Sequence, residues 1–317
     1  MSKKLLGIAA LTAALAACGG GDNNQSGSLS LGVTDAPVDD ADAVVVTFTG
    51  VELLNGDGET AQAFTLSAPQ QIDLLSLQGT NSEFLVEGQE VPVGQYEEVR
   101  LIIDSPSCGE TTDLPSYITV DGTNYPLFVP SGASSGLKVK GPITVAAGGA
   151  AAYVVDFDLR KSIAERGNNN CYNLRPVLRV VDVAEVGTLS GTVDGELLAQ
   201  AHCTNTDITT GEGAAVYIYS GADVTPDDVD DVEPEPLTTA LLTAKNDNSG
   251  DFSYEAGFLL GGDYTASFTC NAGDDDPETN NAGEGAETTT VQFGQTANVV
   301  IQADTVTTQD FQLSVPQ

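Results

Sequence analysis

The segment SLSLGVTDAPVDDADAVVVTFTG (28–50) decides the fold class of this chain. In its first part the apolar residues Leu29, Leu31 and Val33 alternate with small or polar ones, and the alternation resumes at Val44. A period of two places every second side chain on one face of an extended chain, which is typical of a half-buried β-strand. The polar stretch between the two runs contains a proline, which favours a turn that connects two strands.

More segments with the same character follow at similar spacing. They are 62–67, 96–103, 117–120, 125–129, 137–145, 151–159 and 174–183. The pattern predicts only one short helical turn, around 74–78. Regular short strands separated by glycine and proline are typical of β-sandwiches and barrels. We therefore predict an all-β protein, long enough for two β-sandwich domains that follow an N-terminal signal.

The N-terminus has the pattern of a secretory signal. Two lysines precede an apolar run that begins at Leu5 and ends in LAAC (15–18), which is too short to span a membrane as a helix. These last four residues resemble the lipobox of bacterial lipoproteins. The resemblance implies a lipoprotein signal peptide over 1–17, cleavage before Cys18 and acylation (palmitate included) of its thiol. An ordinary secreted protein that is cut near Ala17 is the alternative.

The stretch after the signal predicts a tether. Residues 18–28 consist of the lipidated cysteine and a run without apolar residues, so this segment should be flexible. The acyl chains would make a membrane the first partner of the protein. Gly19, rather than an aspartate, after the cysteine resembles outer-membrane sorting. We expect a lipid-anchored protein of the cell envelope, at the outer membrane.

The charge of the chain excludes one class of partner. The 11 basic residues include Lys3 and Lys4, which leave with the signal, so nine basic residues face 46 acidic ones and the net charge is −37. Such a polyanion repels nucleic acid, and we expect no nucleic-acid partner. Only Lys245 is basic after residue 187, whereas the acidic residues divide evenly between the halves.

The remaining cysteines predict disulfides. Cys108, Cys171, Cys203 and Cys270 form an even set in an exported chain, for which three pairings exist. Because two lie in each half, we expect Cys108–Cys171 and Cys203–Cys270, each worth up to about 4 kcal/mol. A zinc site is excluded by spacing, since no Cys-x-x-Cys pair exists and the sequence has a single histidine.

Five segments in the first half resemble a known family. They are VTDAPVDDADAVVVTFTGVEL (33–53), IDLLSLQG (72–79), VPVGQYEEVRLIID (91–104), YPLFVPSGASSGLKV (125–139) and DFDLRKSI to YNLRPVLRVV (156–181). In this order they resemble a bacterial lipoprotein family known as domain of unknown function 4382. The resemblance implies an exported β domain over 29–184 and brings no catalytic residues.

The second half resembles another β family. Its segments GTVDG (191–195), AAVYIYSG (214–221), KNDNSGDFSYEA (245–256) and LLGGDYTASFTC (259–270) are similar to transthyretin-like, carboxypeptidase-regulatory-like domains. The resemblance implies a second sandwich over 187–313. Two acidic insertions, 222–236 and 271–287, depart from that family, so its surface functions do not carry over simply.

Catalysis has little support in the sequence. Gly132-Ala-Ser134-Ser-Gly136 fits the nucleophile-elbow pattern, but that motif needs a preceding strand, a following helix and a histidine base. A strand follows it instead, and the only histidine, His202, lies in the other half. The chain has no tryptophan that would indicate a sugar-cleaving cleft. We therefore predict a protein that is not an enzyme.

Acidic turns make calcium the one cofactor to consider. Hard cations take six to eight oxygen ligands from such loops. The candidate ligands are Asp35, Asp39, Asp40, Asp247, Asp251, Asp274 and Asp276. None of these loops has the complete EF-hand pattern, because the distal glutamate is missing. Solvated acidic loops without a metal are the alternative.

A last group of charges comes from the strands of the first half. Its members are Arg100, Asp156, Asp158, Arg160, Arg175 and Arg179. They could form ion pairs that fix strand register, or a pocket that holds an anionic group. In the second half, Tyr217 and Tyr219 alternate along one strand and are either half-buried residues or an exposed surface for sugar stacking.

The function that these patterns favour is a lipid-anchored, non-catalytic module of the cell envelope that binds or supports a partner. A carbohydrate- or peptide-binding surface protein, with calcium as a candidate cofactor, is one alternative. An accessory hydrolase is another. The sequence identifies no protein or glycan partner.

Overall fold

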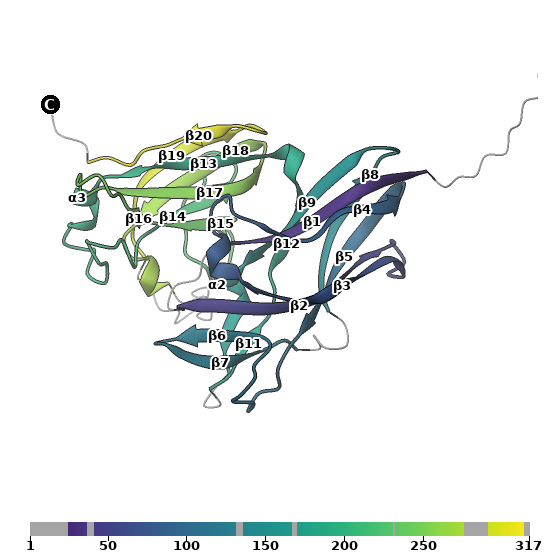
Figure 1. Cartoon of the computed structure of the whole chain (residues 1–317). Coiled ribbons are helices and arrows are strands. Elements are labelled where there is room, and N and C mark those ends of the chain that lie inside the picture. Colours follow the sequence, from purple (N-terminus) through teal and green to yellow (C-terminus); the bar gives the residue numbers. More distant parts are fainter. Residues whose placement is uncertain are drawn as a thin grey trace, which may run out of the picture.

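Four β-sheets make up the molecule. The structure, a computed structural model, describes residues 25–36, 41–130, 136–166, 170–230, 232–275 and 291–313. Two sheets use strands between residues 26 and 182, and the other two use strands between 186 and 308. The two pairs lie beside each other (Figure 1). The prediction of an all-β fold is confirmed, while the domain limits 29–184 and 187–313 stay predictions.

The first sheet has the strand order β12-β9-β1-β4. Its strands are β1 (Ser26–Ala36), β4 (Glu83–Pro92), β9 (Ala150–Asp158) and β12 (Leu178–Asp182). The central pair β1 and β9 is parallel, so Thr34 lies beside Asp156. This pairing brings the end of β1 next to the charged end of β9.

The second sheet has eight strands in the order β10-β11-β7-β6-β2-β5-β8, with β3 paired to β2. They are β2 (Ala43–Leu54), β3 (Thr60–Asp73), β5 (Gly94–Asp104), β6 (Tyr117–Val120), β7 (Thr123–Phe128), β8 (Leu137–Val145), β10 (Ile163–Glu165) and β11 (Tyr172–Leu174). Leu31 and Phe157 from the first sheet share one buried core with Phe48 and Leu101 from the second. The alternating residues quoted from 28–50 therefore form the inner faces of a sandwich.

The second pair of sheets repeats this arrangement. One sheet has the order β16-β17-β13-β20 and the other β15-β14-β18-β19. Their strands are β13 (Val186–Val193), β14 (Ala215–Ser220), β15 (Thr238–Leu241), β16 (Thr243–Ala244), β17 (Phe252–Leu260), β18 (Gly262–Thr269), β19 (Phe293–Ile301) and β20 (Val306–Thr308). Leu189 and Phe252 of the first of these sheets pack with Ile218 and Phe268 of the other.

Helices in the described residues are single turns. They are η1 (Leu74–Leu77), α2 (Leu159–Ser162), η3 (Val183–Glu185), α3 (Gly195–Leu198) and η4 (Ala272–Asp274). The turn predicted around 74–78 is η1. Among the described residues, no helix is both long and apolar enough to cross a membrane. The predicted signal 1–17, Cys18 and most of the predicted tether lie outside these residues.

Two expectations about strands were wrong. The strand predicted over 174–183 is divided, since β11 ends at Leu174, β12 begins at Leu178, and Arg175 lies in the connection. The sequence pattern also missed β4. Three glutamates interrupt its apolar residues, and only Leu85, Val86 and Val91 are buried, so no clean period of two exists.

Both disulfides form as predicted. Cys108 is bonded to Cys171 with their Cα atoms 5.6 Å apart, and Cys203 to Cys270 with their Cα atoms 5.3 Å apart. Each bridge joins residues of one pair of sheets, across 63 and 67 residues of sequence. Each pair of sheets therefore carries its own covalent cross-link.

Candidate functional site: the junction between the two pairs of sheets

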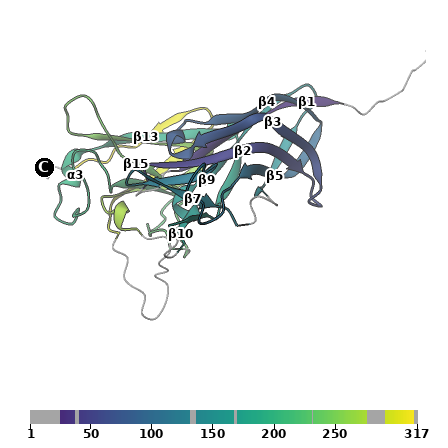
Figure 2. The same cartoon turned by 60° about the horizontal axis from the view of Figure 1, so that its bottom comes forward.

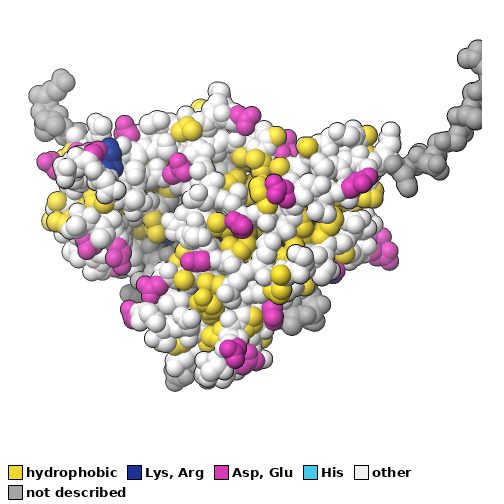
Figure 3. All heavy atoms as spheres, viewed as in Figure 1, with side chains coloured by type: hydrophobic (Ala, Val, Ile, Leu, Met, Phe, Trp, Pro, Cys, Tyr) yellow, Lys and Arg dark blue, Asp and Glu magenta, His cyan; other side chains and the backbone are white. Residues whose placement is uncertain are grey.

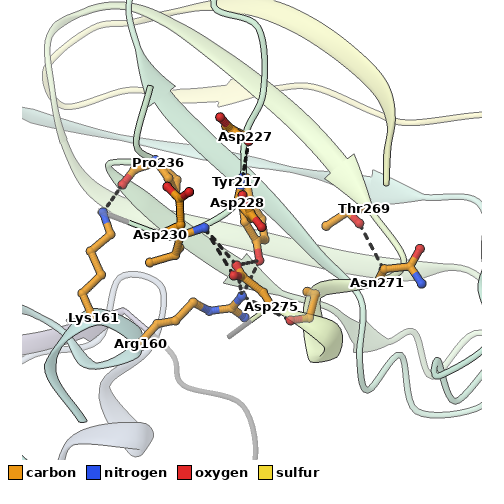
Figure 4. A network of polar contacts seen from close by, with 12 residues as sticks. Arg160, Lys161, Tyr217, Asp227, Asp228, Asp230, Pro236, Thr269, Asn271 and Asp275 are labelled. Atoms are coloured by element: carbon orange, nitrogen blue, oxygen red, sulfur yellow. Dashed lines mark hydrogen bonds and ion pairs between the residues drawn. The ribbon is translucent and has the colours of Figure 1, made fainter. Parts of the chain in front are cut away.

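The most strongly charged buried region lies where the two pairs of sheets meet, and we call it the junction. One side consists of Arg160, Lys161 and Arg179, and the other of Tyr217, Glu235, Phe258 and Asp275. Figure 4 shows the side chains of Arg160 and Lys161 pointing from α2 toward the second pair of sheets. The junction therefore contains three of the nine basic residues that follow the signal.

Arg160 is placed by the turn that follows β9. Asp158 caps α2 by accepting a hydrogen bond from the Lys161 amide at 3.3 Å, and this turn directs Arg160 away from its own sheet. The Arg160 guanidinium is 3% exposed, and its Nη1 lies 3.2 Å from Oδ2 of Asp275. The same nitrogen donates to the Tyr217 hydroxyl and to the carbonyl of Ala272.

Asp275 completes a closed network. Its Oδ2 accepts from the Tyr217 hydroxyl at 2.5 Å, and both carboxylate oxygens lie 3.3 Å from the Val229 amide (Figure 4). Burial raises the pKa of the Asp275 carboxyl, and Arg160 opposes that shift. A fully buried carboxylate with a cation and two further donors is satisfied, so this network joins the two halves rather than presenting a reactive group.

The network lies over the outer face of the sheet that contains β14. Tyr217 and Tyr219 project from β14 on the side opposite to Val216 and Ile218, and they pack with Val229 from the first acidic insertion. Residues from both insertions thus shield the outer face of this sheet. The two tyrosines are buried, at 0% and 1% exposure, which removes the sugar-stacking alternative for them.

Lys161 makes a second contact between the halves. Its Nζ lies 3.1 Å from the Glu235 carboxylate and 3.6 Å from Asp158, and it donates to the carbonyl of Pro236 at 2.5 Å. Glu235 belongs to the first acidic insertion. Segments that look like solvated polyanion in the sequence therefore bind basic residues of the other half.

Arg179 makes the third contact. It lies opposite Asp156 in the antiparallel pair of β12 and β9, and its Nε is 2.6 Å from Oδ2 of that carboxylate. Burial raises the pKa of Asp156, and Arg179 opposes the shift. A second nitrogen of Arg179 donates to the carbonyl of Phe258 at 3.0 Å. Phe258 has a φ of 53°, a left-handed conformation that is unfavourable for a bulky residue.

The predicted charge group is only partly brought together. Asp156 and Arg179 form an ion pair across β9 and β12, as in the alternative of register-fixing pairs, whereas Asp158 pairs with Lys161 within one turn. Arg100 lies in the other sheet of the sandwich and pairs with Glu52 at 2.7 Å. Arg175 is exposed in the connection before β12. Sequence reasoning missed Asp275 as the partner of Arg160.

A cleft of about 410 Å³ opens beside the junction. Its apolar lining includes Val177, Leu178, Val224, Pro234 and Leu237. Of the charged residues around it, Arg179 pairs with Asp156 and Lys161 pairs with Asp158 and Glu235, while Glu233 also lines the cleft. The cleft therefore offers an apolar surface with an ionic rim.

The calcium candidates lie apart in the fold. Asp247 and Asp251 share the turn before β17, where hydrogen bonds from Ser249 lower the pKa of Asp247 to about 2. Asp274 accepts hydrogen bonds from Asn205 and Asn271. Asp39, Asp40 and Asp276 lie outside the described residues, as does Ser134 of the elbow pattern.

Asp35 differs from the other candidates because it is buried. It is 5% exposed, and neither carboxylate oxygen has a hydrogen bond of good geometry among the described residues, although the nearby Leu159 amide acts to lower its pKa. Burial raises the pKa of Asp35 well above its usual range, and the nearby Asp156 and Asp158 raise it further. Such a carboxyl favours its protonated form.

One further cluster has metal-ligand residue types. His202, Cys203 and Cys270 lie within 4.8 Å of one another. The two sulfurs are joined in a disulfide, so they are not thiolate ligands. This cluster does not form a metal site of the zinc type.

The fold and the junction define an all-β protein built from two cross-linked pairs of sheets. Residues 26–176 match the family described as Domain of unknown function (DUF4382). This match overlaps most of the region 29–184 for which the sequence motifs indicated the same family. No curated protein matches the chain in sequence.

Three solved structures illustrate the similarity of this chain to known folds. A leucine-rich repeat protein from Bacteroides thetaiotaomicron aligns with a TM-score of 0.23 and 12% identity, covering 91% of this chain and 26% of that one. A minor pilin of Streptococcus agalactiae aligns with a TM-score of 0.18 and 11% identity over 92% of this chain and 98% of the pilin. The fimbrial anchor protein of Porphyromonas gingivalis has a TM-score of 0.18 and 11% identity, with 78% and 80% covered. At these scores the alignments carry no argument about function.

Proposed function

We propose that this chain is a lipid-anchored, non-catalytic module of the cell envelope that holds its second pair of sheets away from a membrane. The observation that carries the proposal is the buried junction, which joins the two pairs of sheets through Arg160 and Asp275. The described part of β1 begins at the end of the molecule remote from the second pair of sheets (Figure 1). An anchor at Cys18 would therefore attach at that remote end.

The surface of the molecule agrees with a role in presentation. On the face drawn in Figure 3, acidic side chains are scattered and basic ones are nearly absent. A polyanionic surface keeps the protein away from anionic membrane surfaces and from nucleic acid. The basic residues of the junction are withdrawn from this surface and support the contact between the halves.

Lipid anchoring is tested by metabolic labelling with a fatty-acid analogue in the bacterial host. We expect the full chain to take up label and to fractionate with membranes, and Cys18→Ser to lose both properties. The matched variant Gly19→Asp keeps the cysteine, so it should keep the label while moving to the inner membrane. Unlabelled wild-type protein in the periplasm or medium would refute the anchor.

The cleft at the junction supports a second candidate function, namely binding of a peptide or glycan. Val177 lines the cleft and is 45% exposed, so its side chain is available to a ligand. Arrays of peptides and glycans probed with the full chain test this function. Binding should be lost in Val177→Glu and kept in the control Val306→Glu, which changes a 66% exposed valine on β20.

A further inference from the structure

Both halves of the chain form the walls of the cleft at the junction. One wall consists of Val177 and the start of β12, and the other of the first acidic insertion with Leu237. The two halves also lie side by side in the turned view of the chain (Figure 2). The cleft volume of about 410 Å³ is typical of a ligand site, for which about 300–1,000 Å³ is usual. The cleft therefore has room for a few side chains of a bound ligand.

The charges that line the cleft are unequal in number. Four carboxylates and two cations line it, so the lining carries 2 − 4 = −2 when every group is ionised. The six residues are Asp156, Asp158, Glu233, Glu235, Lys161 and Arg179. Arg179 pairs with Asp156, and Lys161 is shared between Asp158 and Glu235. Among the described residues, Glu233 has no basic partner.

The Glu233 carboxylate is available to a ligand. Its side chain is exposed at the border of the cleft. Its Oε2 accepts a hydrogen bond from the Glu235 amide at 3.3 Å, and Oε1 has no hydrogen bond within the described part of the chain. Lysine and arginine donate charged hydrogen bonds to such a carboxylate. A positively charged group is therefore the complement of this side of the cleft.

The rest of the lining is apolar. Val177 is 45% exposed, and Leu178, Val224, Pro234 and Leu237 are partly exposed. An exposed ion pair by itself changes an affinity only about two- to fivefold, so burial of apolar surface has to supply most of the binding. A ligand that fits the cleft thus combines an apolar group with a neighbouring positive charge.

We propose that the cleft binds a peptide in which an apolar side chain stands next to a lysine or arginine. The apolar side chain packs against Val177 and Leu237, and the cation pairs with Glu233. This inference rests on the second candidate function, binding at the cleft, and names the class of ligand. A neutral glycan gains nothing from the excess negative charge, and an acidic ligand is repelled by it. The net charge of −35 also attracts a cationic peptide toward the chain.

Short capped peptides test the proposal, with the full chain as the binding protein. Each peptide has a central leucine or phenylalanine that is flanked on both sides by lysine, glutamine or glutamate. We expect the lysine series to bind about two- to fivefold more tightly than the glutamine series, and the glutamate series to bind most weakly. Sodium chloride at about 0.5 M should reduce these differences, because it screens exposed charges.

A charge reversal at Glu233 separates charge from shape. In Glu233→Lys the lining has three carboxylates and three cations, so the preference for the lysine series should disappear. The position is exposed, so the variant should still fold. The control Glu87→Lys changes an exposed glutamate on β4, at the other edge of the sheet that contains β12, and should keep the preference.

The outcomes distinguish this inference from the function on which it rests. Equal binding of the lysine and glutamate series, or an unchanged preference in Glu233→Lys, would overturn the inference. Glycan binding that is lost in Val177→Glu, without binding of any peptide, would also overturn it but leave the cleft as a binding site. If the wild-type protein bound no peptide and no glycan, the inference and the second candidate function would both fail.

Discussion

Arg160 and Asp275 are the residues on which the junction depends. Removing one partner of a buried ion pair leaves the other charge without compensation, at a cost of about 3–5 kcal/mol. We therefore expect Arg160→Ala to lower the free energy of unfolding by this amount in urea titrations. The exposed Arg175→Ala is the control and should change it by less than about 0.5 kcal/mol.

The double variant Arg160→Met with Asp275→Leu provides the counter-test. Replacing both charges by apolar groups of similar size leaves no buried charge, so much of the lost stability should return. If Arg160→Ala cost no more than Arg175→Ala, the network would not hold the halves together. If the double variant were less stable than Arg160→Ala, the shape of the ionic pair would matter more than its charge.

Replacing Asp35 should raise stability, whereas replacing Arg160 should lower it, because no basic residue compensates the charge of Asp35. Its pKa is raised in the folded protein, so the folded state binds the proton more tightly than the unfolded state. This contribution to stability is present below the usual pKa of an aspartate and is lost as pH rises through the folded value. Asp35→Asn keeps the site neutral and should add about 1–3 kcal/mol at pH 7.

Unfolding curves at several pH values check this prediction. The gain from Asp35→Asn should vanish near pH 3, where the native carboxyl is protonated in both states. Asp263→Asn, at an exposed position, should make no difference at either pH. A destabilising effect of Asp35→Asn at pH 7 would show that the carboxylate has a charged partner.

At the level of strands and loops, the disulfide Cys203–Cys270 supports the junction. Cys270 directly follows β18 and precedes the segment that carries Asp275. Replacing both cysteines by alanine should cost up to about 4 kcal/mol. It should also speed hydrogen exchange in 271–275 more than the matching change at Cys108 and Cys171. Equal exchange in the two variants would contradict a link between this bridge and the junction.

The strands show how much of the fold can be predicted from local sequence. Alternation at Leu29, Leu31 and Val33 was enough to predict β1, because one face of that strand meets the core. Pairing of the cysteines followed from their division between the halves. β4 could not be predicted, since its glutamates face solvent at positions where alternation would place apolar residues.

The junction was predictable only in part, for a physical reason. Asp156 and Arg179 belong to neighbouring strands, so their pairing follows from local order. Arg160 and Asp275 are 115 residues apart, and no periodic signal connects them. The one available sign was compositional, namely two adjacent cations after an apolar strand in a chain that has few of them.

For the whole molecule, the excess of negative charge should make stability depend on salt. Screening reduces self-repulsion in the folded state, so sodium chloride should raise the Tm. Calcium chloride at equal ionic strength then tests the acidic loops. A calcium-specific rise that is abolished by Asp247→Asn with Asp251→Asn would locate a site in the turn before β17, while equal Tm values would leave only screening.

The position of Arg160 and Asp275 along the chain imposes an order on biosynthesis. The half that carries Arg160 is complete before the ribosome reaches Asp275. Its guanidinium meets Tyr217 and Asp275 only after the later half has been made. Maturation can therefore run in one direction, with the earlier half acting as the template on which the later half closes.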